Sequence, residues 1–317
     1  MPLPKIFEVL RLPAIAAPMF LASGPDLVVE TCRSGLVGTF PALNQRTTEG
    51  FGDWLNEIRA RLATAETAAP YGVNLIVHRS NPRLEADLHK IVEHKVPLII
   101  TSLGAVPDVV QAVHSYGGLV FHDVISRRHA EKAAQAGVDG IIAVGAGAGG
   151  HAGTLSPFAL IPEIRSFFDG TLLLSGAMSN GAQIAAARLM GADMAYLGTR
   201  FLATKEAMIS DEQKRMTVDA TAADIIYTPA ISGVAANFLR PSLLAAGLDP
   251  DNLVGHGAMD LGSEAKAWKS VWSAGQGVAS LKDVPSAADL CERLIQEYAA
   301  AMASAGTDPF AMRARNG

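Results

Sequence analysis

Short apolar runs that alternate with helix-patterned segments dominate the first two thirds of this chain. The runs are mostly continuous rather than alternately apolar and polar, which is typical of parallel strands buried on both faces. The eight runs cover residues 14–18, 35–43, 71–77, 96–104, 119–126, 140–150, 171–178 and 194–202. Eight strand–helix repeats favour an α/β fold closed into a (β/α)₈ TIM barrel.

The segments between these runs, and one segment near the end, have the spacing of amphipathic helices. The predicted helices are 25–33, 51–65, 81–93, 105–115, 127–136, 158–168, 181–190 and 285–304. Asn81 before Pro82 predicts the cap of the third helix, and Asn180 predicts the cap of the seventh. An open, doubly wound sheet is the alternative fold. It would need an edge strand with polar alternation, and the sequence has none.

The pattern changes after the eighth run, where the chain becomes helical and irregular. We expect residues 10–203 together with 263–305 to form the barrel. We expect residues 204–262 to form a helical insertion or extension after the eighth strand, near the barrel mouth.

Composition excludes several classes of partner. The chain has 317 residues, 49% of them hydrophobic and 18% charged, which fits a compact globular protein. Its net charge is −5 and no basic stripe occurs, so neither nucleic acid nor an anionic membrane is expected as a partner. Cys32 and Cys291 have no metal-ligand spacing, so we predict reduced thiols and no metal. No signal peptide or apolar span is visible, which favours the cytoplasm.

Two loops after the last two predicted strands suggest a phosphate site. Ser175, Gly176 and Ala177 follow the seventh strand, and Gly198 and Thr199 follow the eighth. Barrels often bind phosphate between these loops, where backbone N–H groups point at the anion and glycine permits close approach. Alternatively, the glycines only make tight turns.

A run of small residues after the sixth predicted strand carries one imidazole. Gly149, Gly150 and His151 lie in this run, whose G-x-G-x-x-G pattern is a weak match because the dinucleotide fingerprint belongs to the first turn of an open sheet. We interpret the run as a flexible loop that lets backbone approach a flat ligand and brings His151 into the site. The alternative is a solvent-facing loop histidine.

Three further strand ends carry candidate binding groups. Ala17, Pro18 and Met19 at the first strand leave room for a flat ring, although they could form a plain turn. Asn74 at the third strand can hydrogen-bond a heteroaromatic edge.

At the fifth strand, His122 and Asp123 are adjacent, so only one of the two side chains can face inward. This pair could instead be a salt-linked structural feature.

These motifs together resemble one known family. The segments AAPMF, YGVNL, AGGHAGTL, SGAMSNGAQIAAARLMGADMAYLGTRFLATKEA and VWSAGQGV are similar to the nitronate monooxygenase (2-nitropropane dioxygenase) family of FMN barrels, over about residues 10–280. The resemblance implies that Gly176, Ala177, Gly198 and Thr199 hold the FMN phosphate, that Ala17, Met19 and Asn74 lie around the ring, and that His151 is the active-site histidine. The full set of expected cofactor-binding residues is Ala17, Pro18, Met19, Asn74, His122, Asp123, Gly149, Gly150, Ser175, Gly176, Ala177, Gly198 and Thr199.

Two departures from the family pattern stand out. Ser-Gly-Ala at 175–177 replaces the usual Ala-Gly-Gly, but an alanine still donates its backbone N–H. Many relatives have a different polar residue in place of Asp123. An acid near the flavin would disfavour the anionic reduced ring, so the substrate or the electron acceptor can differ from the family's.

The resemblance implies oxidation of alkyl nitronates or nitroalkanes by dioxygen, with His151 as the general base. An NAD(P)H-dependent reductase of quinones or enoyl thioesters on the same barrel is one alternative. A non-catalytic barrel that binds a phosphate metabolite is another. The sequence leaves open the physiological substrate, the electron acceptor, the choice between NADH and NADPH, and whether the protein is a homodimer.

Overall fold

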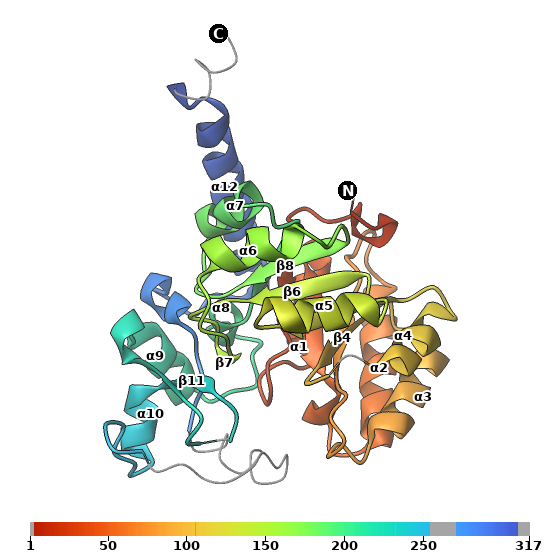
Figure 1. The fold of residues 1–317 in the computed structure, drawn as a ribbon, viewed down its shortest axis with the longest axis horizontal. Helices are drawn as coiled ribbons and strands as arrows, with labels where there is room; N and C mark the ends of the chain where they lie inside the picture. The colour runs from red at the N-terminus through yellow and green to blue at the C-terminus, as the bar shows by residue number, and fades with distance from the viewer. Residues whose placement is uncertain (1–2, 105, 232, 254–270, 310–317) are drawn as a thin grey trace.

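The eight predicted runs form a closed barrel of parallel strands in a computed structural model, which describes residues 3–104, 106–231, 233–253 and 271–309 (Figure 1). The barrel strands are β1 (Ala14–Ala16), β2 (Val37–Pro41), β3 (Gly72–Ile76), β4 (Leu98–Ser102), β5 (Leu119–Val124), β6 (Gly140–Val144), β8 (Thr171–Ser175) and β9 (Met194–Leu197). The circle closes because β1 pairs with both β2 and β9. The TIM barrel is therefore confirmed, and the open sheet is wrong.

Helices cover the outside of the barrel, as the sequence predicts. They are α1 (Pro25–Arg33), α2 (Thr48–Leu62), α3 (Leu84–His94), α4 (Pro107–His114), α5 (Arg127–Gln135), α6 (Pro157–Arg165), α7 (Gly181–Leu189), α8 (Thr199–Leu202) and α12 (Ala287–Gly306). The long α12 lies against α7, and its C-terminal end extends beyond the rest of the protein (Figure 1). Short 3₁₀ turns are η1 (Lys5–Phe7), η2 (Ala42–Asn44), η3 (Ala222–Asp224) and η4 (Gln276–Ser280).

The two predicted helix caps have different outcomes. Asn180 accepts a hydrogen bond from the N–H of Gln183, whose side chain bonds back, so the predicted cap of α7 is confirmed. The predicted cap at Asn81 is wrong, because α3 begins three residues later at Leu84. The Asn81 side chain instead bonds the carbonyl of Ile76 and the N–H of Arg83, which closes a turn before the helix.

Side chains of the barrel strands alternate between two apolar layers. On β5, Phe121 packs inside the barrel, whereas Val120 and Val124 pack between the barrel and its helices. Asp123 shares the parity of Phe121, and His122 shares that of Val120. This alternation places Asp123 toward the barrel axis and His122 toward the helices.

A second, antiparallel sheet lies beyond the barrel. Its strand order is β10 (Ile225–Thr228), β11 (Ala236–Leu239) and β7 (Gly150–His151). Helices α9 (Asp211–Asp219) and α10 (Arg240–Ala245) confirm that the segment after β9 is partly helical, but its two strands were not predicted. They pair with each other and with the glycine-rich loop, which no local pattern reveals. Residues 254–270, which belong partly to the predicted insertion and partly to the predicted barrel, lie outside the described residues.

The two thiols fit their predicted role as ordinary core residues. Cys32 and Cys291 are buried and unbridged, and burial raises the pKa of each thiol to about 12. A buried thiol with so high a pKa is a poor nucleophile and metal ligand. Separately, none of the described helices combines the length and apolar character needed to span a bilayer.

Candidate active site

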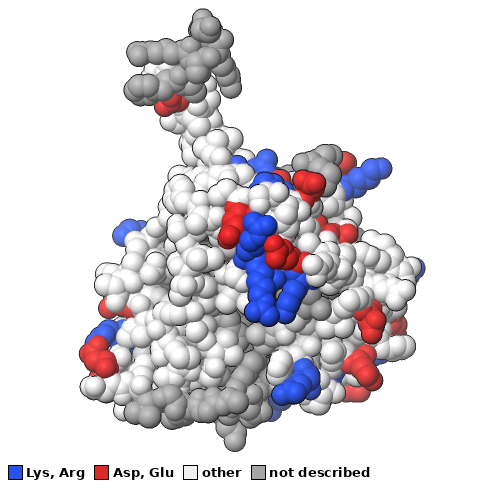
Figure 2. All heavy atoms as spheres, viewed as in Figure 1, with Lys and Arg blue, Asp and Glu red and all other residues white. Residues whose placement is uncertain are grey.

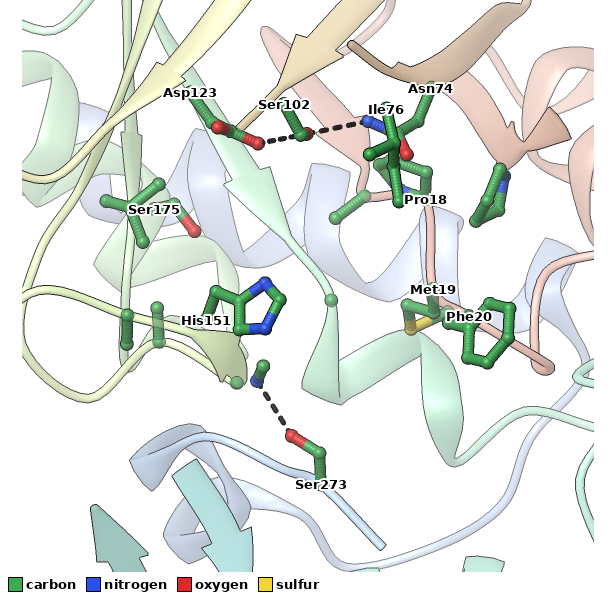
Figure 3. A pocket seen from close by; sticks show the side chains of 18 of the residues that line it. Pro18, Met19, Phe20, Asn74, Ile76, Ser102, Asp123, His151, Ser175 and Ser273 are labelled. Atoms are coloured by element: carbon green, nitrogen blue, oxygen red, sulfur yellow. Dashed lines mark hydrogen bonds between the residues drawn. The ribbon is translucent and has the colours of Figure 1, made fainter. Parts of the chain in front are cut away.

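A cavity of about 1460 Å³ opens at the C-terminal ends of the barrel strands (Figure 3). The barrel loops form one wall, and the second sheet with residues 272–274 forms the other. Every candidate binding or catalytic residue that the sequence suggests borders this cavity. They are Ala17, Pro18, Met19, Asn74, His122, Asp123, Gly149, Gly150, His151, Ser175, Gly176, Ala177, Gly198 and Thr199. The structure thus brings together strand ends that are up to about 180 residues apart in the sequence.

One end of the cavity presents unpaired backbone N–H groups. Gly176 has a φ of +131° and Ala177 a φ of +54°, so the chain turns sharply after β8. The amides of Gly176, Ala177 and Thr199 donate to no acceptor within the described ranges. The Thr199 hydroxyl accepts the N–H of Gly275 at 2.8 Å and keeps its own proton to donate. This donor set fits a phosphate group.

Two glycines at this end have different reasons to be glycine. A Cβ on Gly176 would lie 3.0 Å from the carbonyl oxygen of Ala146, and the backbone is left-handed, so a side chain is strained there. A Cβ on Gly198 would lie 3.7 Å from Ala17 Cβ and 3.8 Å from Met19 Cγ, which are ordinary contacts. The missing side chain of Gly198 therefore leaves room in the cavity beside Met19, where a ligand can approach the backbone.

The barrel floor carries a chain of hydrogen bonds across three neighbouring strands. Asn74 Nδ2 on β3 donates to the carbonyl of Ile100 at 3.0 Å and to Ser102 Oγ on β4 at 2.8 Å. The Ser102 hydroxyl donates to Asp123 Oδ2 on β5 (Figure 3). Burial raises the pKa of the Asp123 carboxyl, while His122, Ser102 and His151 act in the opposite direction. Sequence reasoning missed Ser102, although it is the last residue of the fourth strand.

His122 has a structural partner instead of a clear ligand-facing role. Its Nδ1 lies 2.8 Å from the Thr101 hydroxyl, and both residues are buried on the face of the barrel that meets the helices. Burial lowers the pKa of the imidazole, against the opposing effects of Asp123 and Thr101. His122 borders the cavity, but its side chain points toward the helices, whereas that of Asp123 points toward the barrel axis.

His151 lies on the opposite wall from Asp123, on the two-residue strand β7 (Figure 3). The glycine-rich loop around it is anchored, so the prediction of a flexible loop is wrong. Ser273 Oγ accepts the N–H of Gly150 at 2.7 Å, and Asn237 Nδ2 donates to the carbonyl of Ala148 at 2.7 Å. Ser273 also donates to the carbonyl of Asn237 at 2.6 Å, which ties the two anchors together.

The glycines of this loop are explained by a close backbone approach. A Cβ on Gly149 would lie 2.9 Å from the N atom of Gly275. Tyr227 on β10 adds a third anchor, because its hydroxyl donates to the carbonyl of Ala152 at 3.0 Å. No local sequence pattern identified Ser273, Asn237 or Tyr227 as anchors. The one motif that pointed to this part of the chain was VWSAGQGV, which contains Ser273.

Comparison with known proteins gives one family. The family model described as nitronate monooxygenase matches residues 81–297, well over half of the chain. A nitronate monooxygenase of Paraburkholderia phytofirmans is 29% identical over an alignment 343 positions long, gaps included, which covers 90% of this chain and 92% of that protein. The crystal structure of a nitroalkane oxidase from Streptomyces ansochromogenes has a TM-score of 0.82 at 23% identity, covering 95% of this chain and 99% of that one. At that identity the likeness supports the fold alone.

Another relative carries a different name. An octahydro-1H-indene-4-carboxyl-CoA dehydrogenase of Rhodococcus jostii is 26% identical over 232 residues, which are 73% of this chain and 64% of that protein. The alignment with a relative from Mycobacterium tuberculosis covers 60% of that protein's length, so this chain spans less than two thirds of it. The barrel, the cavity and the family match nevertheless lead to one assignment. The chain belongs to the nitronate monooxygenase family of oxidoreductases.

Proposed function

We propose that this protein binds FMN and oxidises alkyl nitronates, or the corresponding nitroalkanes, with dioxygen as the electron acceptor. The observation that supports FMN binding is the set of backbone amides at Gly176, Ala177 and Thr199 that have no acceptor among the described residues. FMN would place its phosphate there and supply the two-electron redox chemistry. In this proposal, residues 10–203 with 263–305 form the FMN-binding barrel, and residues 204–262 cover the barrel mouth.

The ring of the cofactor fits between the phosphate end and the barrel floor. Gly198 leaves space beside Ala17 and Met19, and Asn74 lies across the floor. The cavity walls in this region are mostly apolar, which suits a flat aromatic ligand with a few fixed polar contacts. Pro18 and Ser175 complete the lining on the barrel side.

His151 is proposed as the general base. Its imidazole faces the cavity from the second sheet, where three hydrogen bonds hold the loop that carries it (Figure 3). A neutral nitroalkane must lose the proton on its α-carbon before oxidation, and His151 would accept that proton. A nitronate has already lost this proton, so it needs His151 only for hydrogen bonding and orientation.

A second candidate function is oxidation or reduction of an acyl thioester, with NAD(P)H as the partner in the reductive direction. The cavity exceeds the roughly 300–1,000 Å³ of ordinary ligand pockets, so it has room for more than FMN and a small nitroalkane. Arg46 and Lys132 border it, are exposed, and form no ion pair with a described residue. Figure 2 shows a group of basic side chains, with acidic ones among them, over the part of the surface where α5 lies in Figure 1. Such cations suit an anionic tail, as in the substrate named for the Rhodococcus relative.

Anaerobic titration of the FMN-loaded protein separates the two functions. We expect propyl nitronate to bleach the visible flavin band completely, and air to restore it. NADH and NADPH should bleach it slowly or not at all. Rapid bleaching by a pyridine nucleotide, without bleaching by the nitronate, would favour the thioester reaction. A colourless protein that takes up no FMN would overturn both and leave the phosphate-metabolite barrel.

A further inference from the structure

The hydrogen bonds of the barrel floor fix which polar atom of Asn74 is left for a ligand. Asn74 has two side-chain N–H donors, and both are used, on the carbonyl of Ile100 and on Ser102 Oγ. The Ile100 carbonyl can only accept, so the amide cannot turn over without opposing two oxygens. Asn74 Oδ1 is therefore the only polar atom left on this side chain, and it acts solely as an acceptor.

The hydrogen bond between Ser102 and Asp123 is donated by the serine. Ser102 Oγ accepts from Asn74 and donates its O–H proton to Asp123 Oδ2 (Figure 3). With this direction Asp123 Oδ2 is an acceptor, so a proton carried by Asp123 lies on Oδ1, the oxygen that Ser102 does not engage.

The surroundings of Asp123 favour the neutral acid. No lysine or arginine forms an ion pair with it in the described part of the chain. The titratable groups around it are His122 on its own strand, His151 on β7 and Tyr196 on β9. Burial raises the pKa of Asp123, although the two histidines act in the opposite direction. The pKa of Tyr196 is raised well above its ordinary value by burial and by the nearby Asp123. A buried carboxyl without a cation holds its proton to higher pH than one in water.

We propose that Asp123 is a ligand-binding residue that stays neutral and donates a hydrogen bond from Oδ1 to an acceptor atom of the bound FMN ring, beside the acceptor Oδ1 of Asn74. The floor then presents one donor and one acceptor, which suits a ring edge that carries both kinds of group. This inference rests on the proposed function in taking FMN as the ligand. The protonation of Asp123 is a property of the protein alone and is tested separately.

The protonation state is measured without any ligand. Protein labelled with carbon-13 at the aspartate carboxyl carbons is titrated by NMR, and Asp123→Asn identifies the signal of residue 123. We expect this carboxyl to titrate well above the ordinary value of about 3.9 and to be still protonated at pH 7. A carboxyl that is already ionised at pH 7 overturns the proposal, because it could then donate nothing.

The donor role is measured through FMN affinity, followed by quenching of FMN fluorescence between pH 5.5 and 9. In Asp123→Asn, the amide oxygen can accept from Ser102 while the NH₂ group donates into the cavity at every pH. We expect the wild-type affinity to fall about tenfold relative to this variant as pH rises and Asp123 ionises, since the donor becomes a negative charge. Asp123→Ala should bind FMN more weakly than Asp123→Asn throughout.

The ratio of the FMN affinities of two variants cancels the effect of ionisation of the FMN phosphate, because this ionisation is the same for every variant. Asp53→Asn, at an exposed position on α2, is the matched control and should follow the wild type. A ratio of wild-type to Asp123→Asn affinity that stays constant over the pH range in which NMR shows Asp123 to ionise overturns the proposal, as does an Asp123→Asn variant that binds as weakly as Asp123→Ala. Failure of all variants to bind FMN would instead refute the proposed function, while the NMR result would still stand.

Discussion

Asp123 and His151 lie on opposite walls of the cavity, and the two walls are built by different means. On the barrel wall, Asp123 lies in a six-residue strand paired on both sides, and the neighbouring strands hold its partners Ser102 and Asn74 in register. On the other wall, His151 lies in a two-residue strand paired on one side to β11.

This difference suggests a division of labour between the walls. A closed barrel leaves few alternatives for the position of a side chain on its strands, because every strand has two ladder partners. The second wall depends on a few side-chain hydrogen bonds over long loops. We therefore expect changes on the barrel wall to alter cofactor binding and stability, and changes on the second wall to alter turnover with little effect on cofactor binding.

The largest effect should come from His151. Replacing it by Asn keeps a polar side chain of similar size but removes the base, so kcat/KM for a neutral nitroalkane should fall at least about 100-fold. The value for the preformed nitronate should fall far less, because that substrate needs no deprotonation. Steady-state oxygen consumption with both forms of nitroethane measures this contrast. Equal losses on the two forms would show that His151 is not the base.

Next in size is a change at the phosphate end of the barrel wall. Gly176→Ala should weaken FMN binding by about 30-fold, roughly 2 kcal/mol, because the new Cβ crowds the Ala146 carbonyl and strains the left-handed turn. Gly117→Ala is the matched control, since Gly117 also has a positive φ, of +84°, but no atom lies within 4 Å of its Cβ. Equilibrium dialysis with FMN should show normal binding in the control.

If Gly176→Ala and Gly117→Ala both lose stability but bind FMN equally well, backbone strain alone explains the glycine. The cavity end formed by residues 175–177 would then not hold the phosphate, and the assignment of the barrel wall as the cofactor wall would fail.

A smaller effect is expected at the anchor of the second wall. Asn237→Ala removes the bond to the Ala148 carbonyl and should lower kcat for a neutral nitroalkane about tenfold, while FMN affinity changes less than twofold. Asn252→Ala serves as the control, because Asn252 is exposed and, among the residues that the structure describes, its side chain bonds only Asp249. A loss of FMN affinity as large as the loss of kcat would mean that the two walls are not separate in function.

The smallest effect concerns backbone strain on the barrel wall. Ala177 has a φ of +54°, and a non-glycine residue there costs about 1–2 kcal/mol. Glycine at this position would relieve the strain, but it would lose more chain entropy on folding, which costs about 0.5–1 kcal/mol. Ala177→Gly should therefore raise the free energy of unfolding, measured in urea, by about 0.5 kcal/mol. Ala300→Gly, on the exposed side of α12, should destabilise it by about 1 kcal/mol. Destabilisation by both substitutions would argue against strain at Ala177.

Local sequence patterns were sufficient to predict the barrel. Continuous apolar runs marked all eight barrel strands, and Pro25 and Arg33 bound α1 as predicted. The loops at 175–177 and 198–199 could be located because they follow directly from such runs. These features depend on residues that are close in sequence, where periodicity and turn chemistry act.

The anchors of the second wall could not be predicted in this way. Ser273 meets Gly150 across 123 residues, and Asn237 meets Ala148 across 89. The strands β10 and β11 are four residues each and gain a partner for the glycine-rich loop only when the chain has folded. When these contacts are not known, so many small residues in a loop predict flexibility. This is why the predicted flexibility of the glycine-rich loop was wrong.

The amino-acid sequence by itself determined the alternation of strands and helices, the closure into a barrel and the set of residues around the barrel mouth, because each is encoded in short-range patterns of apolar and small residues. Only the tertiary structure decided that Asp123 points toward the barrel axis and His122 toward the helices, that Ser102 links Asn74 to Asp123, and that His151 is held on the opposite wall. Those outcomes depend on strand register and on hydrogen bonds between distant segments, which exist only in the folded chain.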